Sequence, residues 1–168
     1  RFDGVRFQVW DERTTPELRS SSVTSLLEDS RGRLWIGMSG GIARLEGGVF
    51  RNLEAGLSQG VTAWSFCETP DGDVWAATSG AGLLRFRGEE TKAVTTANGL
   101  PSNDLRSICR DRAGDLWVGT SGKGVFRMRG EAITVFDTSN GLSSDVVRSV
   151  VPHADGGVWV GTAGGGLL

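Results

Sequence analysis

The chain has 168 residues, a formal net charge of −2 and 38% hydrophobic residues. This length suffices for one domain with a real core, and the near-zero charge argues against a general nucleic-acid binder, which needs a basic surface. No apolar run approaches the ~20 residues of a membrane-spanning helix, so we expect no membrane contact by this segment. Since the chain starts at Arg1 without a signal-peptide pattern, in what looks like the middle of a fold, we expect an excerpt of a longer protein.

Tryptophan recurs along the chain at intervals of 40, 42 and 42 residues, and each of these tryptophans follows a glycine by three positions. The repeated positions are Trp35, Trp75, Trp117 and Trp159, with Gly32, Gly72, Gly114 and Gly156. A period of about 40–45 residues built of short strands is typical of propeller blades. The 26 glycines suit the tight turns between such strands. The pattern therefore predicts an all-β fold, a β-propeller of ~42-residue blades with four antiparallel strands each.

The repeat divides the chain into successive units. Residues 1–22 are expected to supply the outer strands of a preceding blade. Whole blades are expected at 23–60, 61–103 and 104–145, and an incomplete blade at 146–168.

The third unit illustrates the strands expected in each blade. Alternating or β-branched segments bounded by Gly, Asn and Asp clusters are hairpin signals. They predict strands over Asp104–Arg110, Asp115–Thr120, Val125–Arg129 and Ile133–Asp137. We expect each repeated tryptophan to be buried on the second strand of its blade, and no helix longer than one short turn.

The two ends of the chain are complementary within the repeat, because the repeat position of Leu168 directly precedes the repeat position of Arg1. Two interpretations fit. Four units can close on themselves by pairing the two ends, or four repeats can belong to a larger ring. We favour the larger ring, because a cut inside a blade leaves open strand edges that something else must pair with.

The repeated unit resembles the two-component regulator propeller repeat. That pattern runs from a serine and an apolar strand through Asp-x-x-Gly and Leu-Trp-[Val/Ile]-Gly-Thr to a Gly-Gly-Leu hairpin and Gly-Leu-[Ser/Pro]-Ser. Its closest copies here run from Asp111 to Gly130 and from Asp155 to Leu167, and all four units match at the tryptophan. The first two units depart from the pattern, because Met38 stands where the others have threonine and Ala77 replaces a glycine.

The resemblance implies a seven-bladed type of ring in the periplasmic, extracytoplasmic part of a bacterial membrane sensor. The parent protein would be a histidine kinase, often hybrid, or a diguanylate cyclase or transcription regulator. The segment itself would be a non-catalytic module for ligand sensing or interaction in two-component signal transduction. The expected partners are a small-molecule or oligosaccharide ligand and further blades of the parent chain or of another copy, and not nucleic acid.

Two other hypotheses stay open. The chain can be part of a secreted propeller enzyme of the streptogramin-lyase-like kind, which needs acid–base groups that converge on the channel. It can also be a structural or designed propeller fragment that self-associates. A transmembrane helix and a kinase core in flanking sequence would favour the sensor, and a short secreted chain would favour the enzyme.

No set of residues has the spacing of a catalytic or metal site. The G-x-S-x-G matches at Ser39 and Ser58 lie in repeat turns that lead into strands, whereas a nucleophile elbow leads into a helix. His153 is the only histidine, so imidazole-pair metal sites and most histidine-based triads lack partners. Cys67 and Cys109 share one register and are expected as buried free thiols, which leaves the redox compartment unsettled. We expect no catalytic residue, metal or cofactor.

Residues that break the repeat are the candidates for ligand binding, because the shared positions build the blade. Trp64 aligns with Thr24, Arg106 and Arg148, so the repeat does not require an indole there. The ring can pack within the blade, or it can stack on a sugar. In propellers, the loops between successive blades and the middle hairpin loops form one rim. The candidate rim residues, chosen by position, are Gln59, Trp64, Asn103, Asp104, Lys123, Ser144 and Asp145.

Overall fold

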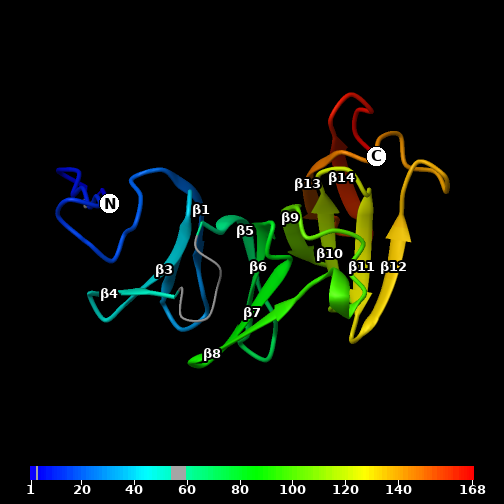
Figure 1. The fold of residues 1–168 in the computed structure, drawn as a ribbon. Coiled ribbons are helices and arrows are strands. Elements are labelled where there is room, and N and C mark those ends of the chain that lie inside the picture. Colours follow the sequence, from blue (N-terminus) through cyan, green and yellow to red (C-terminus); the bar gives the residue numbers. More distant parts are fainter. Residues whose placement is uncertain (3, 54–59) are drawn as a thin grey trace.

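The computed structural model describes residues 1–2, 4–53 and 60–168. In this part of the chain the strands form antiparallel sheets that follow one another in chain order (Figure 1). The one described helix, η1 (Thr96–Asn98), is a single 3-10 turn, so the all-β prediction is confirmed. No described helix is long and apolar enough to cross a membrane.

Each of the first three sheets has four described strands, and neighbours in the chain are neighbours in the sheet. The first sheet contains β1 (Val23–Glu28), β2 (Leu34–Met38), β3 (Gly41–Glu46) and β4 (Val49–Asn52). The second contains β5 (Thr62–Glu68), β6 (Val74–Ser79), β7 (Leu83–Arg87) and β8 (Glu90–Val94). The third contains β9 (Leu105–Arg110), β10 (Leu116–Thr120), β11 (Val125–Arg129) and β12 (Ala132–Phe136). The last contains β13 (Val147–Pro152) and β14 (Val158–Thr162).

The segment before β1 lies against the outer side of the first sheet. Trp10 and Leu18 belong to a cluster with Ile36 and Met38 of β2. Its described residues form no strand beyond an isolated bridge. The assignment of residues 1–22 to a preceding blade and the other predicted blade boundaries stay predictions.

The hydrophobic core lies between neighbouring sheets. Trp35 of β2 shares a cluster with Phe66 and Leu84 of the second sheet, and Trp75 of β6 shares one with Leu116 of the third. The first strands of the sheets, β1, β5, β9 and β13, contact one another in succession. Each sheet therefore depends on its neighbours for burial, as the blades of a repeat protein do.

An arginine lies over the repeated tryptophan in three sheets, because the antiparallel register places the two opposite each other. The pairs are Trp35 with Arg44, Trp75 with Arg85 and Trp117 with Arg127. The guanidinium carbons lie 5.6, 5.5 and 5.7 Å from the respective ring centroids. This distance is within the range of a cation–π contact.

A buried aspartate accepts the indole N–H in two sheets. Trp35 donates to Asp29 at 2.7 Å and Trp117 donates to Asp111 at 2.8 Å. Burial disfavours the Asp29 carboxylate, but hydrogen bonds from the indole and from neighbouring N–H groups outweigh it and lower the pKa of Asp29. The equivalent residues in the second and fourth sheets are Thr69 and His153.

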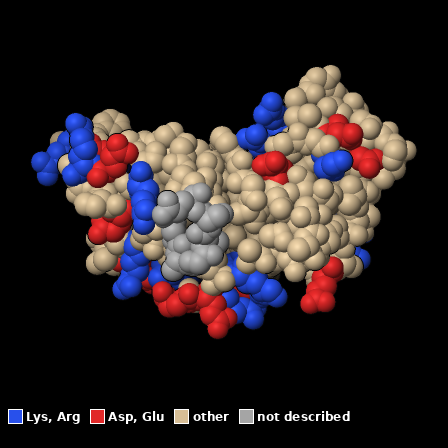
Figure 2. Space-filling model, viewed as in Figure 1, with Lys and Arg blue, Asp and Glu red and all other residues tan. Residues whose placement is uncertain are grey.

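The outer turns carry mixed charge. The buried carboxylate of Asp73 accepts hydrogen bonds from Arg85 and Arg87, and Asp115 accepts them from Arg129. The Arg129 hydrogen bonds hold the pKa of Asp115 below its usual value. Figure 2 shows acidic and basic side chains side by side along the lower edge of the sheets in that view. These charges therefore largely neutralise one another.

The repeated tryptophans lie on the second strand of each sheet, as predicted, but their burial differs. Trp35 and Trp75 are buried and Trp117 is half-buried. Trp159 is 45% exposed, so the prediction of burial is wrong for this residue. The reason is that Trp35 is covered by the aromatic rings of the following sheet, whereas no described sheet follows β14.

We expect Trp35→Ala to lower the free energy of unfolding by about 3–5 kcal/mol, because it removes a ring that is 1% exposed. Trp159→Ala, the matched variant, should cost about 1 kcal/mol or less, since much of that ring is already solvated. Urea denaturation of both variants checks this. Equal losses would contradict the role of the following sheet in burying the tryptophan.

Candidate functional site: inner-strand bulges and rim loops

The first strand of every sheet contains a β-bulge at the same place. Its pairing register shifts between Val23 and Ser25 in β1, and at the matching point in β5, β9 and β13. The extra residues are Thr24, Trp64, Arg106 and Arg148. A bulge re-aims the side chain of the extra residue and is common beside functional sites. Successive sheets thus present these four residues at one repeated position, and we call Thr24, Trp64, Arg106 and Arg148 the bulge row.

The bulge row brings Trp64 and Arg106 together across two sheets. The guanidinium carbon of Arg106 lies 4.8 Å from the Trp64 ring centroid, and its Nε donates to Ser121 Oγ at 2.6 Å. Trp64 is 37% exposed and Arg148, in the next sheet, is also exposed. In the described part of the chain no carboxylate forms an ion pair with Arg106 or Arg148. The row therefore offers an aromatic face beside positive charge.

Thr24, the first residue of the bulge row, is half-buried and hydrogen-bonded. Thr24 Oγ1 donates to the carbonyl of Ala63 at 2.6 Å, and Ser25 Oγ donates to the same oxygen at 2.9 Å. The threonine therefore serves as a link to the second sheet. Arg106 and Arg148 are not among the rim candidates predicted from the sequence. They occupy the same position of the repeat as Trp64, and this shared position is the sequence signal that identifies them.

Two of the predicted rim residues hold their own loops. Asn103 Oδ1 accepts from the backbone N–H of Thr96 at 2.8 Å, and Asp145 Oδ1 accepts from that of Thr138 at 2.8 Å. Their backbone carbonyls accept from the N–H groups of the middle hairpins, such as Gly124 at 2.8 Å. These contacts give Asn103 and Asp145 a structural part in joining each outer strand to the next sheet.

The other rim residues differ in their side-chain hydrogen bonds and in their exposure. Asp104 accepts from Ser79 Oγ at 3.3 Å, and Ser144 Oγ donates to the carbonyl of Ala163 at 3.0 Å. Lys123 is exposed, and its backbone N–H donates to Thr120 Oγ1. Gln59 lies outside the described residues. Trp64, Asp104 and Lys123 are thus the described rim candidates whose side chains are exposed.

The histidine and the two cysteines considered as catalytic or metal-binding candidates lie in a turn and in strands, respectively. His153 lies in the turn before β14, beside Asp155 and edge-on to Trp159 with ring centroids 5.2 Å apart. The described residues contain no group of three or more His, Cys, Asp or Glu able to hold a metal ion. Cys67 and Cys109 are free, as predicted, but only Cys109 is buried and Cys67 is half-buried. Burial raises the pKa of Cys67 to about 11 and that of Cys109 to about 12. A raised pKa keeps a thiol neutral and unreactive at neutral pH.

We expect both thiols to react with iodoacetamide at pH 8 at least about tenfold more slowly in the folded chain than in urea, because the thiolate is the reacting species. Mass spectrometry of each alkylated peptide over time measures this. Folded and unfolded chains that label equally fast would contradict the raised pKa values.

Three segments of the chain, residues 17–40, 99–122 and 141–164, match the family model for the two component regulator propeller. These segments fall in the first, third and last sheets and in the loops before them, and each contains the bulged residue of its sheet. No curated protein sequence matches the chain.

Several solved structures of bacterial proteins are similar to the chain in fold. The extracellular domain of the one component system BT4673 from B. thetaiotaomicron is 20% identical with a TM-score of 0.79, covering 94% of this chain and 22% of that one. The extracellular domain of the hybrid two component system BT3049 from the same organism is 30% identical with a TM-score of 0.70. The match covers 87% of this chain and 20% of that one. Virginiamycin B lyase from Staphylococcus aureus is 15% identical with a TM-score of 0.69, covering 89% and 55%. The chain thus spans about a fifth of the first two structures, and the predicted propeller fold is confirmed.

Proposed function

We propose that this chain, which carries two component regulator propeller repeats, is a non-catalytic sensing or interaction module of a bacterial two-component sensor. The observation that carries the proposal is the family match in three of the four repeats. Similarity to the extracellular domain of a hybrid two component system supports an extracytoplasmic place for the module. The parent protein would be a membrane histidine kinase that receives the signal from the propeller.

The bulge row is the proposed surface for the signal. An indole and an adjacent guanidinium suit a ligand with a flat apolar face and polar or anionic substituents, such as an oligosaccharide. Trp64, Arg106 and Arg148 come from three successive sheets, so one ligand that spans them would report on the relative position of the blades. Lys123, on the neighbouring hairpin loop, would extend the same surface.

We expect Arg148→Ala to change the free energy of unfolding by about 0.5 kcal/mol or less, because the side chain is exposed. Trp64→Ala should lower it by about 1 kcal/mol, because the ring is only 37% exposed and contacts Arg106. Both should weaken signalling by the full-length protein, measured as reporter output over a dose series of an oligosaccharide found by screening the chain on a glycan array. Asn103→Ala serves as the structural comparison. It should lower stability by about 1 kcal/mol, because it removes the acceptor of the Thr96 N–H. An unchanged dose response in both exposed variants would count against the bulge row.

The alternative of a propeller lyase is supported only by its fold. The lyase is 15% identical, and a likeness at this level shows a shared fold alone. Incubation of the chain with a streptogramin, followed by chromatography, tests the alternative directly.

We also propose that the described sheets belong to a wider ring, completed by further blades of the parent chain or of another copy. In Figure 1, β1 and β14 lie at opposite ends of an arc and do not meet. Val151 and Trp159 are exposed on the face that corresponds to the covered face of the earlier sheets. Such a face is covered when another blade follows.

Residues 1–168 alone should therefore associate head to tail, because association covers this exposed face. Light scattering over a concentration series measures the mass. A monodisperse monomer whose terminal amides are protected from hydrogen exchange would instead indicate closure of four blades.

A further inference from the structure

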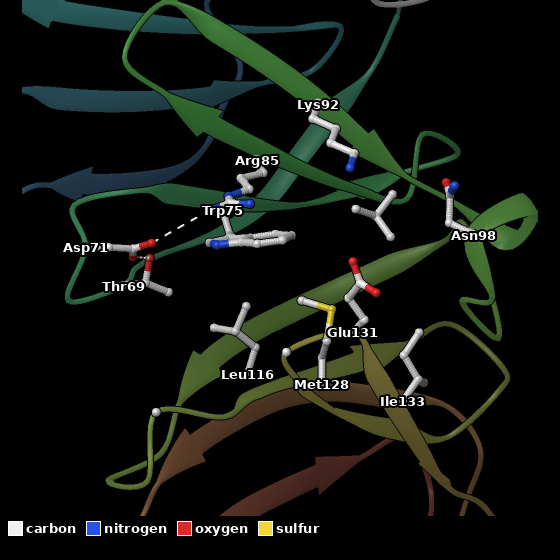
Figure 3. Close-up of a pocket in the computed structure, with 13 residues that line it drawn as sticks. Thr69, Asp71, Trp75, Arg85, Lys92, Asn98, Leu116, Met128, Glu131 and Ile133 are labelled. Carbon is white, nitrogen blue, oxygen red and sulfur yellow. Dashed lines mark hydrogen bonds and ion pairs between the residues drawn. The ribbon is translucent and has the colours of Figure 1, made fainter.

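A cleft of about 620 Å³ separates the second sheet from the third. The ring of Trp75 forms one wall, and Leu116, Met128 and Ile133 form the other (Figure 3). The cleft is thus a slot between a flat aromatic face and three aliphatic side chains. None of these residues belongs to the bulge row or to the rim loops.

The cleft exists because the second tryptophan lacks the aromatic partners of the first. Trp35 packs against Phe66 and Phe86, with ring centroids 6.4 and 5.0 Å away. At the next interface the equivalent residues are Ile108 and Met128, which hold the same register in the third sheet. Both are buried in one cluster with Trp75, but each side chain is smaller than that of phenylalanine. This interface therefore keeps a vacant slot where the preceding one is packed.

Opposite charges flank the opening of the slot. Figure 3 shows Lys92 of β8 and Glu131 of the β11–β12 turn directed toward the cleft from opposite sheets, with Asn98 nearby. Neither Lys92 nor Glu131 forms an ion pair or hydrogen bond with a described residue. The other charged lining residues, Asp71 and Arg85, pair with each other. One free ammonium and one free carboxylate thus remain available to a ligand.

We propose that this cleft binds a small zwitterion with an apolar side chain, an amino acid of the size of phenylalanine. The side chain would enter the slot against Trp75 and Met128. The ligand carboxylate would bind Lys92 and its ammonium would bind Glu131. A neutral sugar would leave both charges unpaired, and a purely apolar ligand would leave both unused. The inference does not rest on the proposed sensing function, because it uses other residues and predicts another ligand.

Isothermal titration calorimetry of the full chain with L-phenylalanine tests the proposal. Two analogues each lack one charge, 3-phenylpropionate the ammonium and phenethylamine the carboxylate. Both should bind at least about tenfold more weakly than L-phenylalanine, because each loses one charged hydrogen bond. Methyl glucoside should not bind in the cleft.

Three variants in the cleft and two control variants outside it locate the site. Lys92→Gln and Glu131→Gln should each weaken binding by at least about tenfold, whereas Arg112→Gln and Glu28→Gln, exposed charges outside the cleft, should leave it unchanged. Met128→Phe places in the slot the ring that Phe86 supplies at the preceding interface. It should abolish binding of L-phenylalanine without lowering the melting temperature.

Absence of binding at about 10 mM L-phenylalanine, where even a millimolar affinity is detected, would overturn the proposal. So would binding of either analogue as tightly as L-phenylalanine, or retention of full binding by Lys92→Gln and Glu131→Gln. If Met128→Phe melts early, the two charge variants decide the outcome, because their side chains are exposed and their loss does not disturb the core. A loss of signalling in the bulge-row variants bears only on the sensing function.

Discussion

The seam between the first strands of neighbouring sheets is the constraint on which the other features depend. Ser25 Oγ donates to the carbonyl of Ala63, Ser65 Oγ accepts from the N–H of Ile108, and Ser107 Oγ accepts from that of Val150. Only a small residue fits on the second strand where it pairs with the seam serine, as Gly37 of β2 does with Ser25 of β1. A Cβ on Gly37 would clash with the carbonyl oxygen of Ala63. A serine hydroxyl in each of the first three sheets thus joins that sheet to the next at their inner strands, where there is no room for larger side chains.

Because the seam holds the sheets together at their first strands, the space between their second and third strands must be filled by large side chains. The repeated tryptophan is that filler. Its N–H has to be satisfied once it is buried, and Asp29 and Asp111 do this in two sheets. The arginine over the ring is joined to a carboxylate in turn, as Arg85 is to Asp73. The tryptophan that fills the space between two sheets is therefore held in its orientation by hydrogen bonds and ion pairs of neighbouring polar side chains.

The two proposed binding regions arise where individual sheets depart from this plan. At the bulges the backbone requires an extra residue but not a particular side chain, so the positions are free to carry Trp64 or Arg106. At the second interface the substitution of Met128 for an aromatic residue leaves a cleft beneath Trp75. Neither departure disturbs the seam. Variation in side chains can therefore create binding surfaces while the sheets keep their spacing.

The sequence by itself determined the strands, their order and the place of each repeated tryptophan, because glycine turns and a constant period act locally along the chain. It also indicated that Cys67 and Cys109 are free thiols, since both occupy an apolar position of the repeat. Contacts between sheets were decided only by the tertiary structure. The serines recur visibly in the sequence, but their partners lie about one repeat away. Likewise, the exposure of Trp159 and the loop-holding hydrogen bonds of Asn103 and Asp145 depend on which surfaces meet, and no local pattern encodes that.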